Sequence, residues 1–370
     1  MKAAYYERQG NASEVLRLGD FPVPQPGPGE VRVRIHASGL NPSDIKARTG
    51  FSGHSAFPMV IPHQDGAGVI DAVGAGVAPT RTGERVWLFE AQYRRPFGTA
   101  AEYAVVPEAQ AVPLPGNVSF EVGACLGIPA LTAHRCLFSD GDIKGRAILV
   151  QGGAGAVGTA AILLAKWAGA WVATTVSTPA QADAARRAGA DLVINRRLQD
   201  VVAIVKSATR QRGVDRIVEV SLQDNLGIDM RCLANGGIIS SYAVGSAADQ
   251  VPLPLLDAMI AGCTFRFVYI YTVPAAAKSA AVSAISQCLA DGAYAPAIGM
   301  QFALDAIVEA HQAQESGQVI GKIIVRPSLV RSHEPTDVQP NDCSPQGRVG
   351  KPASPHSQCR ALPAKDGRDS

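Results

Sequence analysis

The feature that most constrains this chain is a glycine-rich turn at 152–158, which follows the apolar run 147–150 and precedes an apolar, helix-like run at 159–166. Gly153, Gly155 and Gly158 occupy the glycine positions of the G-x-G-x-x-G pattern. In that pattern the first glycine permits a tight turn, the second lets backbone amides approach a pyrophosphate, and the third brings helix against strand. The start of the following helix adds unpaired N–H groups and the positive end of its dipole.

A second strand-like run, 171–176, follows the turn at the spacing of a βαβ unit. The sequence therefore predicts a dinucleotide-binding site. The turn residues that we expect to contact the cofactor are Gly153, Ala154, Gly155, Ala156, Val157 and Gly158.

Two patterns divide the rest of the chain. Residues 1–122 carry short alternating runs between prolines and glycines, which indicates a compact β-barrel. Residues 123–263 alternate strand-like and helix-like runs, which is typical of an α/β, doubly wound parallel sheet. Residues 264–327, with a strand, two alanine-rich helices and a final strand, are expected to return and complete the first domain. Residues 328–370 are poor in large apolar residues, and we expect a disordered tail there.

The expected elements can be given by residue. Expected strands cover 1–6, 30–37, 66–73, 85–89, 147–150, 171–176, 191–195, 215–220, 238–242 and 321–325. A helix is expected within 120–137 with an interruption at Pro129, and further helices at 179–187 and 198–210.

Composition narrows the class of protein. The hydrophobic fraction of 47%, the charged fraction of 18% and the net charge of +2 are typical of a globular enzyme, and membrane and nucleic-acid partners are not expected. Glu7 and Arg8 interrupt any N-terminal apolar run, so the expected location is the cytoplasm. All seven cysteines lie at or after Cys125 without a C-x-x-C pair, which argues against a disulfide framework and a structural zinc site.

With these motifs in place, the chain resembles the zinc-free quinone oxidoreductases, related to zeta-crystallin, of the medium-chain dehydrogenase/reductase superfamily. The resemblance runs from Met1 to about Pro327 and implies a GroES-like barrel domain, a Rossmann domain and an active site in the cleft between them. The segments that carry it are 39–44, 66–69, 131–133, the glycine turn and 321–325.

The resemblance also bears on metal. Zinc-dependent members of the superfamily place a ligating cysteine where this chain has Ser38, and a hydroxyl is a poor zinc ligand beside a thiolate. His63 stands near another ligand position, but one histidine cannot hold a catalytic zinc, so we expect a polar cleft residue there and no metal.

The end of the second Rossmann strand indicates the cofactor. NAD-specific sites place Asp or Glu there to bind the ribose hydroxyls, whereas this chain has Ser177 and Thr178. The lysine that many quinone reductases carry nearby is replaced by Gln181, and we expect Arg196 to supply the charge for a 2′-phosphate. The expected cofactor is NADPH.

Few side chains are needed for the chemistry, because the nicotinamide supplies the hydride. Asn41 or Lys46 is a candidate donor to the developing charge on a carbonyl oxygen, and no indispensable proton donor is identified. The family implies that Asn41 and Thr132 contact the cofactor, and Asp44 is expected to cap a helix rather than act as an acid.

The sequence thus predicts NADPH-dependent, zinc-independent reduction of a small quinone. Two alternatives stay open: reduction of an α,β-unsaturated carbonyl such as an alkenal or enoyl thioester, and a non-catalytic NADPH- or RNA-binding crystallin-like protein. The β-rich, apolar segment 263–271 corresponds to a strand that pairs across a two-fold axis in the family, so we expect a homodimer.

Overall fold

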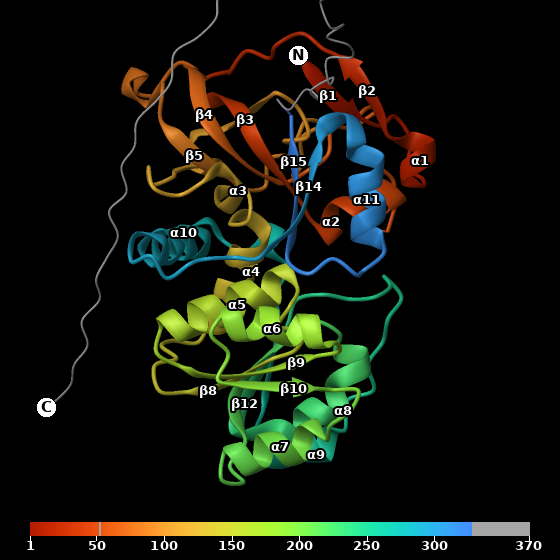
Figure 1. The fold of residues 1–370 in the computed structure, drawn as a ribbon, viewed down its shortest axis with the longest axis vertical. Coiled ribbons are helices and arrows are strands. Elements are labelled where there is room, and N and C mark those ends of the chain that lie inside the picture. The colour runs from red at the N-terminus through yellow and green to blue at the C-terminus, as the bar shows by residue number, and fades with distance from the viewer. Residues whose placement is uncertain (52, 328–370) are drawn as a thin grey trace, which may run out of the picture. The chain divides into compact units, whose positions relative to one another are not determined.

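The computed structural model describes residues 1–51 and 53–327 (Figure 1). The tail expected at 328–370 lies outside the described residues. Two large sheets organise the described chain, one of six strands and one of seven, with a separate two-stranded sheet at the N-terminus.

The six-stranded sheet is parallel throughout and has the order β10-β9-β8-β11-β12-β13. Counted along the chain this order is 3-2-1-4-5-6, the Rossmann arrangement, and it reverses direction between β8 and β11. The doubly wound sheet expected from the sequence is confirmed. Its strands are β8 (Ala147–Val150), β9 (Trp171–Val176), β10 (Leu192–Asn195), β11 (Val214–Glu219), β12 (Leu233–Ser241) and β13 (Thr264–Phe267).

Helices cover both faces of this sheet (Figure 1). Ile148 and Val150 of β8 belong to the core shared with α5 and α6, whereas Ala147 and Leu149 belong to the core shared with α7 and α8. Alternate residues of one continuous apolar strand thus enter two cores, as a parallel strand buried on both faces requires. The helices are α5 (Ala156–Trp167), α6 (Pro179–Arg187), α7 (Val201–Ala208), α8 (Leu222–Cys232) and α9 (Leu255–Ala261).

The seven-stranded sheet has the path β14-β15-β3-β4-β5-β7, with β6 paired to β3. It corresponds to the barrel expected from the N-terminal third, extended by two strands from the C-terminal end. Its strands are β3 (Glu30–Leu40), β4 (Asp65–Val73), β5 (Arg85–Leu88), β6 (Tyr103–Pro107), β7 (Ala111–Pro113), β14 (Ile298–Ala303) and β15 (Lys322–Arg326). The N-terminal pair is β1 (Lys2–Tyr5) and β2 (Arg17–Asp20), and the remaining α-helices are α1 (Ala12–Val15), α2 (Pro42–Thr49), α3 (Phe120–Gly123), α4 (Gly127–Phe138), α10 (Ala275–Ala290) and α11 (Ile307–Glu315).

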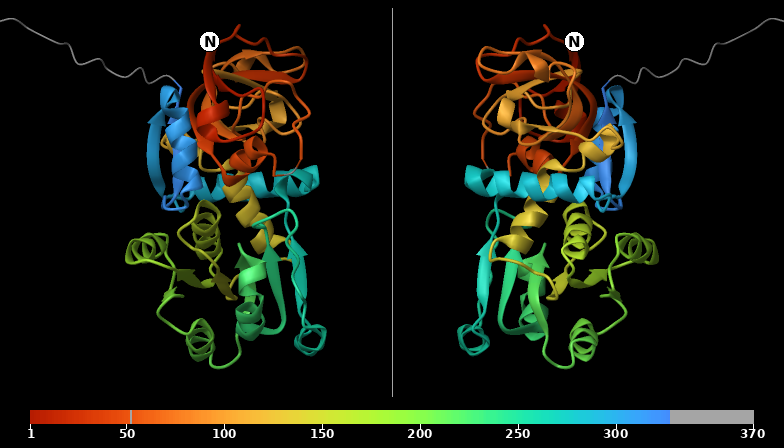
Figure 2. Two further views of the ribbon diagram at one scale, coloured as in Figure 1. Left: turned by 90° about the vertical axis from the view of Figure 1, so that its right-hand side faces the viewer. Right: turned by 90° about the vertical axis from the view of Figure 1, so that its left-hand side faces the viewer.

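Two expectations about element boundaries were wrong. The return of the chain to the first domain does not begin at residue 264. Strand β13 pairs with β12 of the Rossmann sheet, and α10 packs on α4 and α5 (Figure 2). The strands that join the barrel are β14 and β15. The helix break is not at Pro129 either. Pro129 lies in the first turn of α4, where backbone N–H groups have no helical partner and proline is tolerated.

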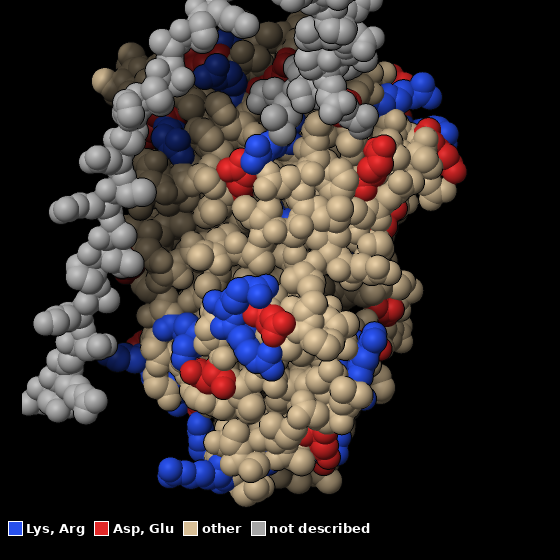
Figure 3. Space-filling view, viewed as in Figure 1, with Lys and Arg blue, Asp and Glu red and all other residues tan. Residues whose placement is uncertain are grey.

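Two further features concern the length of the helices and the distribution of charged residues on the surface. Within 1–51 and 53–327, no helix is long and apolar enough to cross a membrane. On the face shown in Figure 3, the described Lys and Arg residues are interspersed with Asp and Glu rather than forming one continuous stripe.

Candidate active site

The glycine turn lies at the carboxyl end of β8, next to the point where the strand order reverses. Ligands of open α/β sheets bind at that position. Gly155 is the N-cap of α5, and no side chain of the described residues caps this helix, so its first amides face outward without a protein partner. The turn therefore offers an anion site.

The four glycines at 152–158 have different roles. The left-handed backbone of the turn lies at Gly152, with φ +71°, one residue before the first glycine of the motif. A Cβ on Gly153 would lie 2.0 Å from Thr174 Oγ1, and one on Gly158 would lie 2.3 Å from Gly152 O, so both positions serve close packing. A Cβ on Gly155 would meet only Gly152 O, at 3.6 Å. Gly155 therefore has open space on its side-chain face.

At the far end of β9 the structure brings two expected residues together. Arg196 Nε donates a hydrogen bond of 3.1 Å to Ser177 Oγ, and the guanidinium is otherwise exposed. Thr178 has a different role, because its hydroxyl accepts from Gln181 N and caps α6. Ser177 and Arg196 form a pair that can bind a phosphate, and Thr178 is primarily a helix cap.

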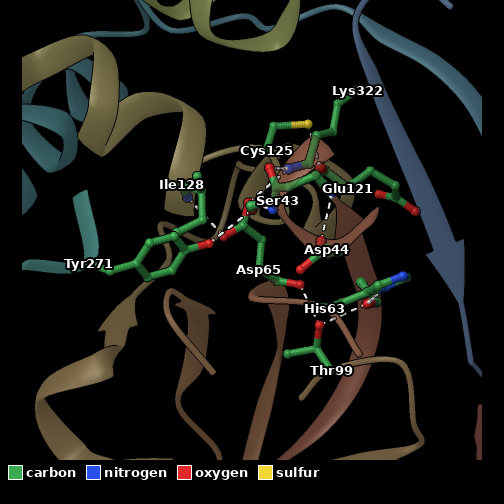
Figure 4. A network of polar contacts seen from close by, with 12 residues as sticks. Ser43, Asp44, His63, Asp65, Thr99, Glu121, Cys125, Ile128, Tyr271 and Lys322 are labelled. Carbon is green, nitrogen blue, oxygen red and sulfur yellow. Dashed lines mark hydrogen bonds and ion pairs between the residues drawn. The ribbon is translucent and has the colours of Figure 1, made fainter. Parts of the chain in front are cut away.

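On the barrel side, Asp65 and Lys322 belong to a buried polar network (Figure 4) that also includes Asn41. Asn41 Nδ2 donates to Asp65 Oδ2 at 2.8 Å, and its Oδ1 accepts from Lys322 Nζ at 2.5 Å. Lys322 also forms an ion pair of 2.7 Å with Asp65, whose other oxygen accepts from Ile128 N at 2.8 Å. Because Asn41 is only 1% exposed and its amide is engaged at both ends, it holds this network together and is not an exposed donor to substrate.

Asp44 caps α2, as expected, by accepting from Asn41 N at 2.8 Å. Burial and the neighbouring Asp65 carboxylate raise the pKa of Asp44 to about 8. The adjacent Ser43 accepts a hydrogen bond of 2.9 Å from the hydroxyl of Tyr271, which is buried against it. This contact joins α2 to the segment that follows β13.

His63 is fully buried rather than a cleft residue. Its Nδ1 lies 2.8 Å from Ser38 Oγ and its Nε2 lies 3.1 Å from Nε2 of His311, so both ring nitrogens are engaged. Burial lowers the pKa of His63 well below its ordinary value, which keeps the ring neutral. Among the described residues, no group of three His, Cys, Asp or Glu side chains is placed to hold a metal ion.

Lys46 and Thr132 differ in the solvent exposure of their side chains. Lys46 is half-buried, with its Nζ 2.7 Å from Val244 O and 4.5 Å from the centre of the Phe51 ring. Burial lowers its pKa. Thr132 is buried in α4, at 4% exposure. Of the two candidate donors, Asn41 and Lys46, Lys46 is the one whose side chain is partly exposed.

Sequence reasoning did not find Asp65 or Lys322, and it did not find the backbone bond of 3.1 Å from Gly321 N to Ala154 O. That bond ties the glycine turn to the start of β15. Gly321 and Lys322 lie in the segment 321–325, which carries the family resemblance, but the sequence analysis gave neither residue a part in the site.

Comparison with known proteins agrees with this architecture. Residues 27–116 match the family described as "Alcohol dehydrogenase GroES-like domain", and residues 156–287 match "Zinc-binding dehydrogenase". The chain is 30% identical over 315 residues to the quinone oxidoreductase of Homo sapiens, covering 84% of this chain and 94% of that protein.

Solved structures give the same result. The quinone oxidoreductase of Escherichia coli, solved with NADPH, is 25% identical with a TM-score of 0.76, covering 88% of this chain and all of that one. An NAD-dependent alcohol dehydrogenase is 29% identical with a TM-score of 0.80, covering 88% of this chain and 99% of that one. From its two domains and these relatives, the chain belongs to the quinone oxidoreductase family of the medium-chain dehydrogenase/reductase superfamily.

Proposed function

We propose that the protein is an NADPH-dependent, zinc-independent reductase of quinones. The observation that carries the proposal is the open glycine turn at the reversal point of the Rossmann sheet, with the uncapped first turn of α5 behind it. The NADPH found in the Escherichia coli relative supports the choice of cofactor.

The residues present fit such a cofactor. Backbone amides of Ala156 and Val157 would bind the pyrophosphate, whereas the Gly155 amide donates to Gly152 O at 3.2 Å. Ser177 with Arg196 would bind the 2′-phosphate. When bound, the nicotinamide supplies the hydride. The protein's part is then to orient the two reactants and to stabilise the charge that develops on the substrate oxygen.

We propose Lys46 as the residue that stabilises that charge. Its ammonium is held by Val244 O, and the lowered pKa caused by burial makes it a better proton donor than an exposed lysine. Lys46→Met should therefore lower kcat while the Kd for NADPH changes little. Lys46→Arg keeps the positive charge but is a much weaker acid, so it separates charge stabilisation from proton donation.

The donor chemistry around His63 supports the zinc-independent part of the proposal. Ser38 stands where zinc-dependent relatives carry a cysteine, and the two ring nitrogens of His63 bond to Ser38 and His311. The assay follows oxidation of NADPH and NADH with a quinone panel after exhaustive chelation. Loss of activity on chelation would contradict zinc independence, and equal use of both nucleotides would contradict the NADPH preference.

The same assay addresses the competing substrate class. A neighbour described as a 2-haloacrylate reductase has a TM-score of 0.75 at 24% identity, which shows a shared fold only. Alkenals and enoyl thioesters are therefore included beside the quinones. Higher kcat/KM for those compounds would replace the quinone assignment by reduction of α,β-unsaturated carbonyls.

We also propose that the protein is a homodimer. β13 is an edge strand of the Rossmann sheet, so one side of its backbone has no strand partner among the described residues. Large apolar side chains are exposed beside it: Phe267 is 74% exposed and Tyr269 is 58% exposed. Pairing with a second copy would cover this edge.

A further inference from the structure

Two carboxyl groups are buried behind the glycine turn and have no part in the proposed reaction. Glu219 ends β11 and Asp229 lies in α8, and both side chains have no solvent exposure. Glu219 Oε1 accepts from Asn225 Nδ2 at 3.0 Å and from the backbone N–H of Ser221. These donors compensate one negative charge, so the second carboxyl group requires an explanation.

The two groups cannot both be ionised. Glu219 Oε2 and Asp229 Oδ2 receive no hydrogen bond from the described residues, and the two carboxyl groups lie close enough for the charge of one to act on the other. Two adjoining carboxyl groups in a buried site keep one proton, because two like charges there repel each other. Burial and the Glu219 charge raise the pKa of Asp229 well above its ordinary value, which identifies Asp229 as the protonated partner.

A chain of hydrogen bonds connects this pair to the turn. Gly152 N donates to Thr175 Oγ1 at 3.1 Å, and the Thr175 hydroxyl donates to Gln151 Oε1 at 2.6 Å. Gln151 Nε2 then donates to Asp229 Oδ1 at 2.8 Å. All three hydrogen bonds run in the same direction, from Gly152 to Asp229 and so toward the Glu219 carboxylate. Each bond therefore polarises the next, and the bonds strengthen one another. The chain ends on the glycine that carries the left-handed backbone of the turn.

We propose that Asp229, at the end of the hydrogen-bond chain through Gln151 and Thr175, is a positioning residue that holds the glycine turn in its cofactor-binding shape and releases it at alkaline pH. The proposal rests on the proposed function for the identity of the cofactor. Loss of the proton would leave two adjacent buried carboxylates, and their repulsion would move Asp229 away from Gln151. The expected consequence is weaker NADPH binding as pH rises.

Other charged groups do not replace that proton. Burial raises the pKa of Cys232 to about 12 and also raises that of Tyr242, so both stay neutral over the range tested. Lys206 points to Leu233 O at 3.4 Å, and Arg231 donates to Gly227 O at 3.1 Å. The remaining ionisable groups on α8 and β11 have their own partners: Asp224 bonds to Ser221, Asp215 to Arg212, and Arg216 to Asp140.

The test is a fluorescence titration of the full chain with NADPH between pH 6 and 9.5. For the wild type we expect the Kd to rise about tenfold over the alkaline part of this range, the scale of one charge-linked hydrogen bond. Asp229→Asn keeps a donor toward Glu219 and an acceptor for Gln151, so its Kd should stay flat with pH. Asp229→Leu removes both contacts and should bind NADPH about tenfold more weakly at every pH.

Asp215→Asn is the matched control. Asp215 lies on β11, as Glu219 does, but it accepts a hydrogen bond from Ala147 N, at the opposite end of β8 from the turn. This variant should keep the wild-type pH profile. A wild-type Kd that is as flat as that of Asp229→Asn, or wild-type affinity in a folded Asp229→Leu variant, would overturn the proposal.

Amide exchange of the segment 151–158, measured without nucleotide, tests the chain of hydrogen bonds independently of the cofactor. Exchange should be faster in Asp229→Leu and unchanged in Asp229→Asn; equal exchange in all three proteins contradicts the proposal. If the wild type fails to bind NADPH at any pH while exchange responds as expected, the proposed function is wrong and the positioning role of Asp229 stands.

Discussion

Gly153 and Gly155 lie two residues apart in the glycine turn, yet the same substitution should have opposite effects at the two positions. In Gly153→Ala the new methyl would lie 2.0 Å from Thr174 Oγ1, which donates to Val150 O at 2.7 Å. Overpacking costs about 1–3 kcal/mol, and disturbing that hydrogen bond adds about 1 kcal/mol. We expect the free energy of unfolding to fall by about 2–4 kcal/mol.

Gly155→Ala meets no such obstacle. The backbone at Gly155 has φ −77° and ψ 166°, which any residue adopts, and the methyl would contact only Gly152 O at 3.6 Å. Alanine is a poorer N-cap than glycine by about 0.5 kcal/mol, and the reduced freedom of the unfolded chain offsets this by about 0.4–1 kcal/mol. Stability should therefore change by less than about 0.5 kcal/mol.

Nucleotide binding should show the reverse order of effects. The methyl of Gly155→Ala would occupy the space that the pyrophosphate needs, and loss of one hydrogen bond to a charged group costs about 1.5–3 kcal/mol, or about 10- to 150-fold in Kd. Gly155→Asp, which also adds a negative charge, should abolish binding. Urea unfolding and NADPH titration of both alanine variants give the comparison. Wild-type NADPH affinity in Gly155→Ala, or a loss of stability equal to that of Gly153→Ala, would refute the reasoning.

The remaining predictions concern the nucleotide, a buried acid and the assembly. Arg196→Ala should weaken NADPH binding by about tenfold or more and NADH binding little, because only NADPH carries the 2′-phosphate; equal losses for both would contradict the Ser177–Arg196 site. Since the pKa of Asp44 is raised to about 8, the folded protein binds an extra proton between about pH 4 and 8, so the free energy of unfolding should fall as pH rises through that window. Urea unfolding at pH 5 and pH 8 measures this slope, which Asp44→Asn should reduce; an unchanged slope would contradict the burial argument. Sedimentation at micromolar concentration should show a dimer for the wild type and more monomer for Phe267→Lys, and a monomeric wild type would contradict the pairing of β13.

Local patterns predicted most of the Rossmann sheet. The runs that became β8 and β9 are continuous and apolar, and their bounds agree with the structure because both faces of each strand are covered by helices. The start of α6 at Pro179 was equally legible, whereas the capping role of Thr178 was not predicted. These features depend on neighbours in sequence, and sequence patterns report on them directly.

The barrel side of the site could not be predicted in the same way. Asn41 and Lys322 are 281 residues apart, and Asp65 and Lys322 are 257 apart, so no local pattern indicates that they meet. Asn41 was therefore taken for a candidate donor to the substrate, although it is buried beside the Asp65–Lys322 ion pair. His63 was expected to line the cleft but is fully buried, and the reason is similar. Its partner His311 belongs to α11, near the opposite end of the described chain, so no local pattern indicates their contact.

The bond between Gly321 N and Ala154 O has a mechanical consequence. Gly321 is followed directly by Lys322, whose ammonium anchors Asp65 and Asn41, so the nucleotide-binding turn and the buried ion pair of the barrel are fastened to consecutive residues. Any rotation of the barrel relative to the Rossmann sheet that preserves this bond must pivot about it. Such a pivot lets more distant parts of the barrel and the sheet move while the distance between the turn and the start of β15 stays fixed.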